Sequence, residues 1–122
     1  MAYRVFWQVP QQVLCVELEG TVSLDDFVQI NQAVHDHLGD EKTNRSVALL
    51  VDITRPGNTP QAFQQLKASQ TYVTRRDLRF ILVVGSNKFM RLMMMLIFNL
   101  CRPSLRFFDN MAPALTFLDS RH

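Results

Sequence analysis

The chain has few of the residues that mark several common classes of small protein. Its 122 residues include two cysteines, four glycines and five prolines. The two cysteines, Cys15 and Cys101, are too few for a disulfide framework, and both stand among apolar neighbours, as buried free thiols do. The first residues lead straight into a strand pattern, without the apolar core and cleavage site of a signal peptide. The sequence therefore predicts a cytoplasmic protein.

Motifs of catalysis and metal binding are also missing. The chain has no Gly-x-Ser-x-Gly, His-Glu-x-x-His or Walker pattern. His35 and His37 stand two residues apart on an expected helix, where their side chains point about 200° from one another and cannot share a metal ion. Basic residues without interleaved surface aromatics argue against nucleic-acid binding. We expect no cofactor, no metal ion and no nucleic-acid partner.

Two short apolar runs, at residues 47–51 and 80–84, carry the strongest structural signal. Each is apolar at every position and ends at a polar turn before a helix-forming segment. Strands of this kind need cover on both faces, as parallel strands between helical layers do. With 48% hydrophobic and 20% charged residues, the chain has the composition of an ordinary globular protein. At its length we expect one α/β domain spanning residues 1–122.

The remaining elements follow from turn residues and periodicity. Ser23 is a suitable N-cap for a helix that Gly39 ends, Thr59-Pro60 opens a second helix, and Asp109 is expected to cap the last one. The expected order is β-β-α-β-α-β-α-β-α, with strands at 3–9, 12–19, 47–52, 80–84 and 105–108 and a third helix at 88–101. A hairpin followed by right-handed βα units gives a mixed sheet of four or five strands with helices packed on it.

Charge is divided unevenly along the chain. Residues 1–61 carry four basic and eight acidic side chains, whereas residues 62–122 carry nine basic and three acidic ones. Such a division can steer an acidic partner or favour contact between copies of the chain, unless the two halves interleave in the fold. Most of the basic excess comes from Arg75, Arg76, Arg79, Lys88, Arg91, Arg102 and Arg106.

The order of elements resembles that of the SpoIIAA-like family. The resemblance rests on Gly20 after the second strand, on the strand end Val51-Asp52, and on the closing segments 106–109 and 114–118. These small bacterial domains share the fold of the sporulation anti-sigma-factor antagonists (STAS domains) and are related in shape to lipid-binding CRAL-TRIO domains. The resemblance implies a SpoIIAA-like single domain acting as a non-enzymatic regulatory or protein-interaction module.

In STAS antagonists, as the resemblance implies, a partner kinase phosphorylates a serine or threonine after the third strand. Asn58 and Thr59 occupy the matching positions, although the Asp before them and the Gly after them are missing. A phosphate on Thr59 would gain from the free N–H groups of a helix start. The alternative is that Thr59 is a plain N-cap.

The ends of the two apolar strands form a second candidate site. In open α/β sheets, ligands gather beyond the carboxyl ends of the strands. These ends present Asp52, Thr54, Arg55, Ser86, Asn87 and Lys88. The last three are candidates for holding an anion, and Asp52 with Thr54 is the basis for a hydrolase-type alternative. The competing interpretation is that these residues only cap and turn the chain.

The third expected helix has almost no polar face. At ~1.5 Å per residue it is about 20 Å long, too short for a bilayer core of roughly 30 Å. An all-round apolar helix needs cover on more than one side, and methionine suits adaptable apolar contacts. Three covers remain open: the domain itself, a second subunit in a homodimer, or a lipid or other apolar ligand lying between helix and sheet. The residues we assign to this contact are Met90, Met93, Met94, Ile97 and Phe98.

Overall fold

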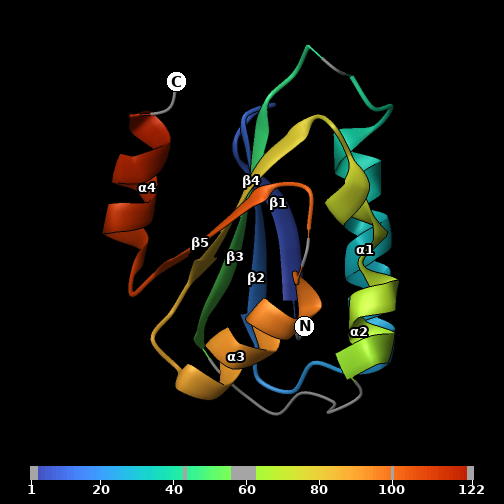
Figure 1. The fold of residues 1–122 in the computed structure, drawn as a ribbon, viewed down its shortest axis with the longest axis vertical. Helices are drawn as coiled ribbons and strands as arrows, with labels where there is room; N and C mark the ends of the chain where they lie inside the picture. The colour runs from blue at the N-terminus through green and yellow to red at the C-terminus, as the bar shows by residue number, and fades with distance from the viewer. Residues whose placement is uncertain (1–2, 43, 56–62, 100, 121–122) are drawn as a thin grey trace.

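Five strands form one mixed sheet in the order in which they occur along the chain (Figure 1). The computed structural model describes residues 3–42, 44–55, 63–99 and 101–120. The first two strands pair antiparallel, and each later strand lies parallel to its predecessor. The sequence prediction of a mixed sheet of four or five strands is thus confirmed, with five. The strands are β1 (Tyr3–Val9), β2 (Val13–Glu19), β3 (Val47–Arg55), β4 (Leu78–Val84) and β5 (Ser104–Phe108).

Helices cover the two faces of the sheet unequally (Figure 1). Because β2 to β5 are parallel and stand in chain order, right-handed crossovers place all the connecting helices on the same face. These are α1 (Leu24–Leu38), α2 (Phe63–Ser69) and α3 (Lys88–Ile97), and a 3₁₀ turn, η1 (Thr71–Thr74), follows α2. The opposite face carries α4 (Met111–Asp119), which lies against β4 and β5.

Each face of the sheet has its own apolar core. Under α1, α2 and α3, one set of strand residues such as Leu49 and Ile81 packs on the buried sides of the helices. The alternate residues, such as Leu50 and Leu82, face α4 in a smaller cluster. The runs at 47–51 and 80–84 are therefore apolar throughout because both of their faces are covered, as their sequences predict.

The first long helix begins and ends where its capping residues predict. The Ser23 hydroxyl accepts a hydrogen bond from the Asp26 N–H at 3.1 Å, and the Asp26 carboxylate accepts one from the Ser23 N–H at 2.9 Å. This reciprocal capping box satisfies two amide groups that a helix start otherwise leaves unpaired. Gly39 follows the helix with a φ of +66°, and its N–H donates to the His35 carbonyl.

The last two helices differ from the sequence prediction at their ends. The third helix stops at Ile97 instead of continuing to residue 101. The Arg102 N–H donates to the Val73 carbonyl at 3.1 Å, which draws the chain away from the helix axis and into β5. The N-cap position of α4 belongs to Asn110, and Asp109, the predicted cap, forms an ion pair with Arg91 at 3.1 Å. Among the helices in the described parts of the chain, none is long and apolar enough to cross a membrane.

Candidate functional site

The carboxyl ends of β3 and β4 border a hollow of about 300 Å³. Thr54 stands at the end of β3, and Ser86 and Asn87 follow β4, so three of the predicted strand-end residues share this space. Asp109 also lines the hollow, and sequence reasoning missed it as a site residue. Its position directly after β5 was the available signal, since parallel strands end at the same edge of a sheet. We call this space the strand-end hollow.

Gly85 determines where the chain leaves β4 and enters the rim of the strand-end hollow. Its φ is +148°, and its N–H donates to the Phe108 carbonyl at 2.8 Å. A Cβ at this position would lie 2.6 Å from Cγ1 of Ile53, so the chain passes closer to β3 than any side chain allows. Ser86 and Asn87 therefore leave the sheet directly at the rim of the hollow.

Most polar side chains near the strand ends already serve local structure. The Asn87 side chain accepts a hydrogen bond from the Met90 N–H at 2.9 Å and so caps α3. One oxygen of Asp52 accepts from both the N–H and the hydroxyl of Thr54, at 2.9 and 2.6 Å. Arg55 pairs with Glu19 at 3.2 Å, while Lys88 is exposed in the first turn of α3. These contacts are those that the capping and turn interpretation predicts. The other predicted candidates, Asn58 and Thr59, lie outside the described residues.

The apolar residues assigned to an external contact on the third helix are in fact inside the molecule. Met90, Met93, Met94, Ile97 and Phe98 are at most 3% exposed and belong to the larger core. They pack on the sheet and α2, so the prediction that these five side chains form the surface that meets a partner is wrong, although Phe98 still borders the open groove described below. A partner on this helix has to contact its opposite side.

That opposite side carries large apolar side chains in solvent. Phe89, Leu92, Met95 and Leu96 are 41% to 53% exposed and recur at helical spacing along the outer side of α3. We call these four residues the α3 stripe. A hollow of about 520 Å³ adjoins it, the α3 groove, lined by Leu92, Met95, Leu96, Phe98, Asn99, Cys101, Pro103 and Leu105.

Between α3 and the sheet there is almost no free space. The cavity enclosed there by Phe27, Tyr72, Met94 and their neighbours has a volume of about 10 Å³. That is room for hardly one water molecule. The predicted ligand cavity of a few hundred Å³ between this helix and the sheet is therefore wrong, because Met90, Met93, Met94 and Ile97 fill the space themselves.

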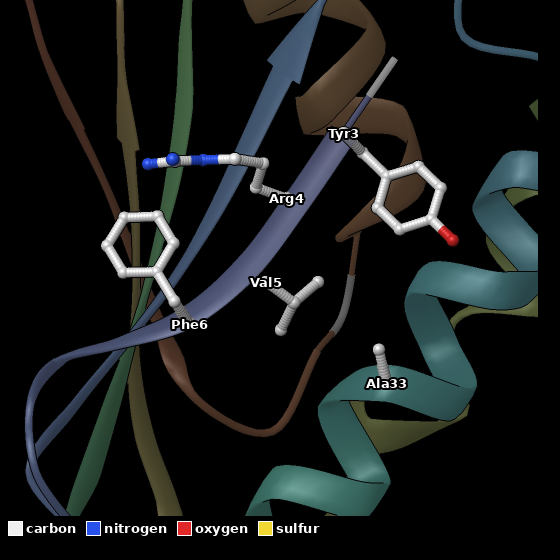
Figure 2. Close-up of a pocket in the computed structure, with 5 residues that line it drawn as sticks. All are labelled: Tyr3, Arg4, Val5, Phe6 and Ala33. Carbon is white, nitrogen blue, oxygen red and sulfur yellow. The ribbon is translucent and has the colours of Figure 1, made fainter. Parts of the chain in front are cut away.

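A third open hollow, of about 550 Å³, lies at β1, an edge strand of the sheet. Figure 2 shows Tyr3 and Val5 directed toward α1, where Ala33 completes the lining, and Arg4 and Phe6 directed to the other side. The Arg4 guanidinium lies 4.8 Å from the centre of the Phe6 ring and forms an ion pair with Glu17 at 3.1 Å. The cation at this edge is thus already partnered.

Burial shifts the pKa of two side chains with nucleophilic or basic groups, Cys15 and His35. Burial raises the pKa of the Cys15 thiol to about 12, so it stays protonated at neutral pH. Burial, together with the charge of Arg75, lowers the pKa of His35, whose ring also contacts the Thr71 hydroxyl at 2.9 Å. Within the part of the chain that the structure describes, no three His, Cys, Asp or Glu side chains gather as a metal site would require.

Comparison with known proteins agrees with this architecture. The fold is similar to that of an uncharacterised protein of the DUF3478 family from Shewanella loihica PV-4, whose crystal structure has a SpoIIAA-like fold. The two share 18% sequence identity at a TM-score of 0.67, over 96% of this chain and 92% of the other. No curated protein sequence matches the chain. The model of the SpoIIAA-like family matches residues 13–119, and this chain belongs to that family.

Proposed function

We propose that the chain is a non-enzymatic interaction module of STAS-like type, and that a second copy of the chain covers the α3 stripe. The observation that carries this proposal is the exposure of Phe89, Leu92, Met95 and Leu96 on one helix of a small domain. Monomeric proteins rarely leave a contiguous apolar surface of this kind in water, and such surfaces mark contacts with partners. The polar side chains at the strand ends, which cap and turn the chain, support a role without catalysis.

A second copy suits this surface because the α3 stripe and the α3 groove lie side by side. Across a two-fold axis, each copy presents the same patch to the other, so one patch has to supply both the projecting and the receiving parts. Phe89 at the start of α3 projects, and the α3 groove beside Leu92 and Met95 receives. Methionine adds conformational freedom, which lets the two copies adjust to one another.

Sedimentation velocity of the purified protein at micromolar concentration tests the homodimer. We expect a dimer for the parent chain and a monomer for Leu92→Glu, because the charge would be buried without a partner at the seam. Leu92 is 53% exposed within the subunit, so this change leaves the fold intact.

Val28→Glu is the matched control, since Val28 is 50% exposed, belongs to α1 and does not line the α3 groove. It should remain dimeric. A parent chain that sediments as a monomer at all micromolar concentrations contradicts the proposal, and so does a dimer that persists in Leu92→Glu.

An apolar ligand in the α3 groove is the second candidate. The groove has about 520 Å³, within the range of small-molecule sites, and most of its lining side chains are apolar. Native mass spectrometry of protein taken directly from cells would then show a monomer with retained mass, lost in Leu92→Glu and kept in Val28→Glu. A dimer without added mass favours the second copy instead.

A further inference from the structure

The amino ends of β4 and β5 border an open polar hollow of about 500 Å³. This is the end of the sheet opposite to the strand-end hollow, because both strands run parallel. Three of its lining residues are arginines with exposed side chains, Arg76, Arg79 and Arg102. Leu78, Pro103 and Ser104 complete the lining. We call it the arginine hollow.

Backbone contacts bring the three arginines together from separate segments. Ser104 is the register partner of Phe80, so the start of β5 lies beside the start of β4. The Arg102 N–H donates to the Val73 carbonyl at 3.1 Å, which fixes Arg102 next to the segment that leads into Arg76. The hollow is therefore a product of the fold, since Arg102 is far from the other two arginines in sequence.

These three cations have no carboxylate partner among the described residues. The ion pairs found there involve other arginines, namely Arg4, Arg45, Arg55, Arg75 and Arg91. Asp77 stands between Arg76 and Arg79 in sequence, but its carboxylate is fully buried and bonded to Arg45 and Arg75. Three like charges around one hollow repel each other, and an anion in the hollow removes that repulsion.

We propose that the arginine hollow binds the phosphate group of a phosphomonoester. A phosphomonoester near neutral pH carries up to two negative charges on three terminal oxygens, which suits three guanidinium forks. A single carboxylate has one charge and two oxygens, so it would leave cations unpaired. The hollow is far larger than a phosphate group, so it has room for part of the molecule that carries the phosphate.

This site goes beyond the proposed interaction module and does not depend on it. The arginine hollow and the α3 groove share Pro103 at their border, but no residue of the α3 stripe lines the arginine hollow, whereas Leu92, Met95 and Leu96 line the groove. Loss of the dimer in Leu92→Glu therefore leaves phosphate binding in place, and failure of one proposal can be told from failure of the other.

Isothermal titration with inorganic phosphate and with glycerol 3-phosphate, at low ionic strength, tests the site. We expect saturable binding to the parent chain, weakened about tenfold or more in Arg79→Ala and in Arg102→Ala. Arg79→Lys should bind with intermediate affinity, because it keeps the charge and loses the paired donors of the guanidinium. Both arginines are exposed, so circular dichroism should show unchanged folding.

The matched control is Lys67→Ala, which removes an exposed positive charge from α2, outside the hollow. It should bind as the parent chain does. Absence of saturable binding overturns the proposal, as does an equal loss in Lys67→Ala or equal affinity for succinate.

The same chemistry also occurs in lipid headgroups, and a second arm separates the two sources. Phosphatidylcholine vesicles with and without phosphatidic acid are mixed with the same variants and sedimented. Binding only to vesicles with phosphatidic acid, lost in Arg79→Ala and Arg102→Ala, supports the hollow with a lipid as the source of the phosphate. Vesicle binding that these two variants leave unchanged counts against the hollow.

Discussion

Asp77 is fully buried, and its carboxylate holds two arginine side chains from different parts of the chain. Arg75 donates to it through two nitrogens, both at 2.9 Å, and Arg45 forms a further ion pair with it. The Arg45 guanidinium also donates to the Leu38 carbonyl at 2.7 Å, at the end of α1. The cluster thus ties α1 and the segment before β3 to the start of β4.

We expect Asp77→Asn to lower the free energy of unfolding by about 3 kcal/mol. A neutral side chain would leave two largely buried guanidinium groups without their counter-charge, and removing one partner of a buried pair is strongly destabilising. Urea unfolding followed by circular dichroism measures the change. Asp36→Asn is the control, because Asp36 is exposed on α1 and should cost well under about 1 kcal/mol. Similar losses in both variants would contradict a special role for the buried cluster.

The same carboxylate gives the protein a defined acid sensitivity. Burial alone would raise the pKa of Asp77, but the hydrogen bonds and charges of Arg75 and Arg45 outweigh it and lower the pKa from 3.8 to about 2. The unfolded chain therefore binds the proton more readily in this range. The stabilisation is complete above about pH 4 and is lost as the pH falls toward about 2. In Asp77→Asn this part of the pH dependence should disappear.

Substitutions at two glycines can distinguish the cost of a strained backbone from the cost of a steric clash. Gly85 and Gly39 both have positive φ values, +148° and +66°, so a side chain strains the backbone at either position. At Gly85 the added Cβ would also meet Ile53 at 2.6 Å, whereas nothing lies within 4 Å at Gly39. We expect Gly39→Ala to cost about 1 kcal/mol of unfolding free energy and Gly85→Ala about 3 kcal/mol or more. Equal losses in thermal unfolding would show that the contact with Ile53 is unimportant.

At the scale of elements, local sequence signals were sufficient for two strands that are apolar at every position and for the start of the first helix. The apolar runs at 47–51 and 80–84 predicted β3 and β4, and Ser23 predicted the start of α1. Capping residues and short apolar runs are local features, so a single sequence contains them. The sequence placed the end of the third helix at residue 101, but the helix ends at Ile97, and the chain beyond it makes a long-range hydrogen bond, from Arg102 to Val73, that no local signal contains.

The inward side of α3 could not be read from hydrophobicity, because apolar residues occupy both sides. Met94 and Met95 are neighbours of the same type, yet one is 1% and the other 47% exposed. Only contact with the sheet and α2 decides between them, and that contact is tertiary. Lys88 and Asn99, which would lie about 20° apart if the helix continued to residue 101 as predicted, are both exposed and gave a hint to the outer side.

For the candidate sites too, the sequence predicted one group of neighbouring residues and missed another. That Thr54, Ser86 and Asn87 share a hollow follows from the rule that parallel strands end together. The sequence did not reveal the arginine hollow, since Arg102 reaches Arg76 and Arg79 only through the pairing of β5 with β4. Sites built from the amino ends of strands have no comparable rule.

At the scale of the whole molecule, the two faces of the sheet have unequal cover. Three helices pack on one face, while α4 is the helix on the other face in the described structure. Leu118 of α4 is 3% exposed and belongs to the smaller core, and the nearby Phe117 ring lies 5.5 Å from that of Phe80. The smaller core thus depends on one short helix that lies on β4 and β5.

Whether both cores unfold together can be measured from the far edge of the sheet. Trp7 is the single tryptophan of the chain and lies in β1, at the edge opposite to β5, where its ring packs 6.4 Å from that of His37. We expect Leu118→Ala to lower the free energy of unfolding by about 2–4 kcal/mol through the cavity it creates. If residues 1–122 form one cooperative domain, Trp7 fluorescence and far-ultraviolet circular dichroism should shift together to the same new midpoint.

Leu115→Ala is the control, because Leu115 is only half-buried and should shift the midpoint less. A Trp7 transition that stays at the parent midpoint while the circular dichroism changes would mean that α4 unfolds on its own, and the prediction of one domain would fail.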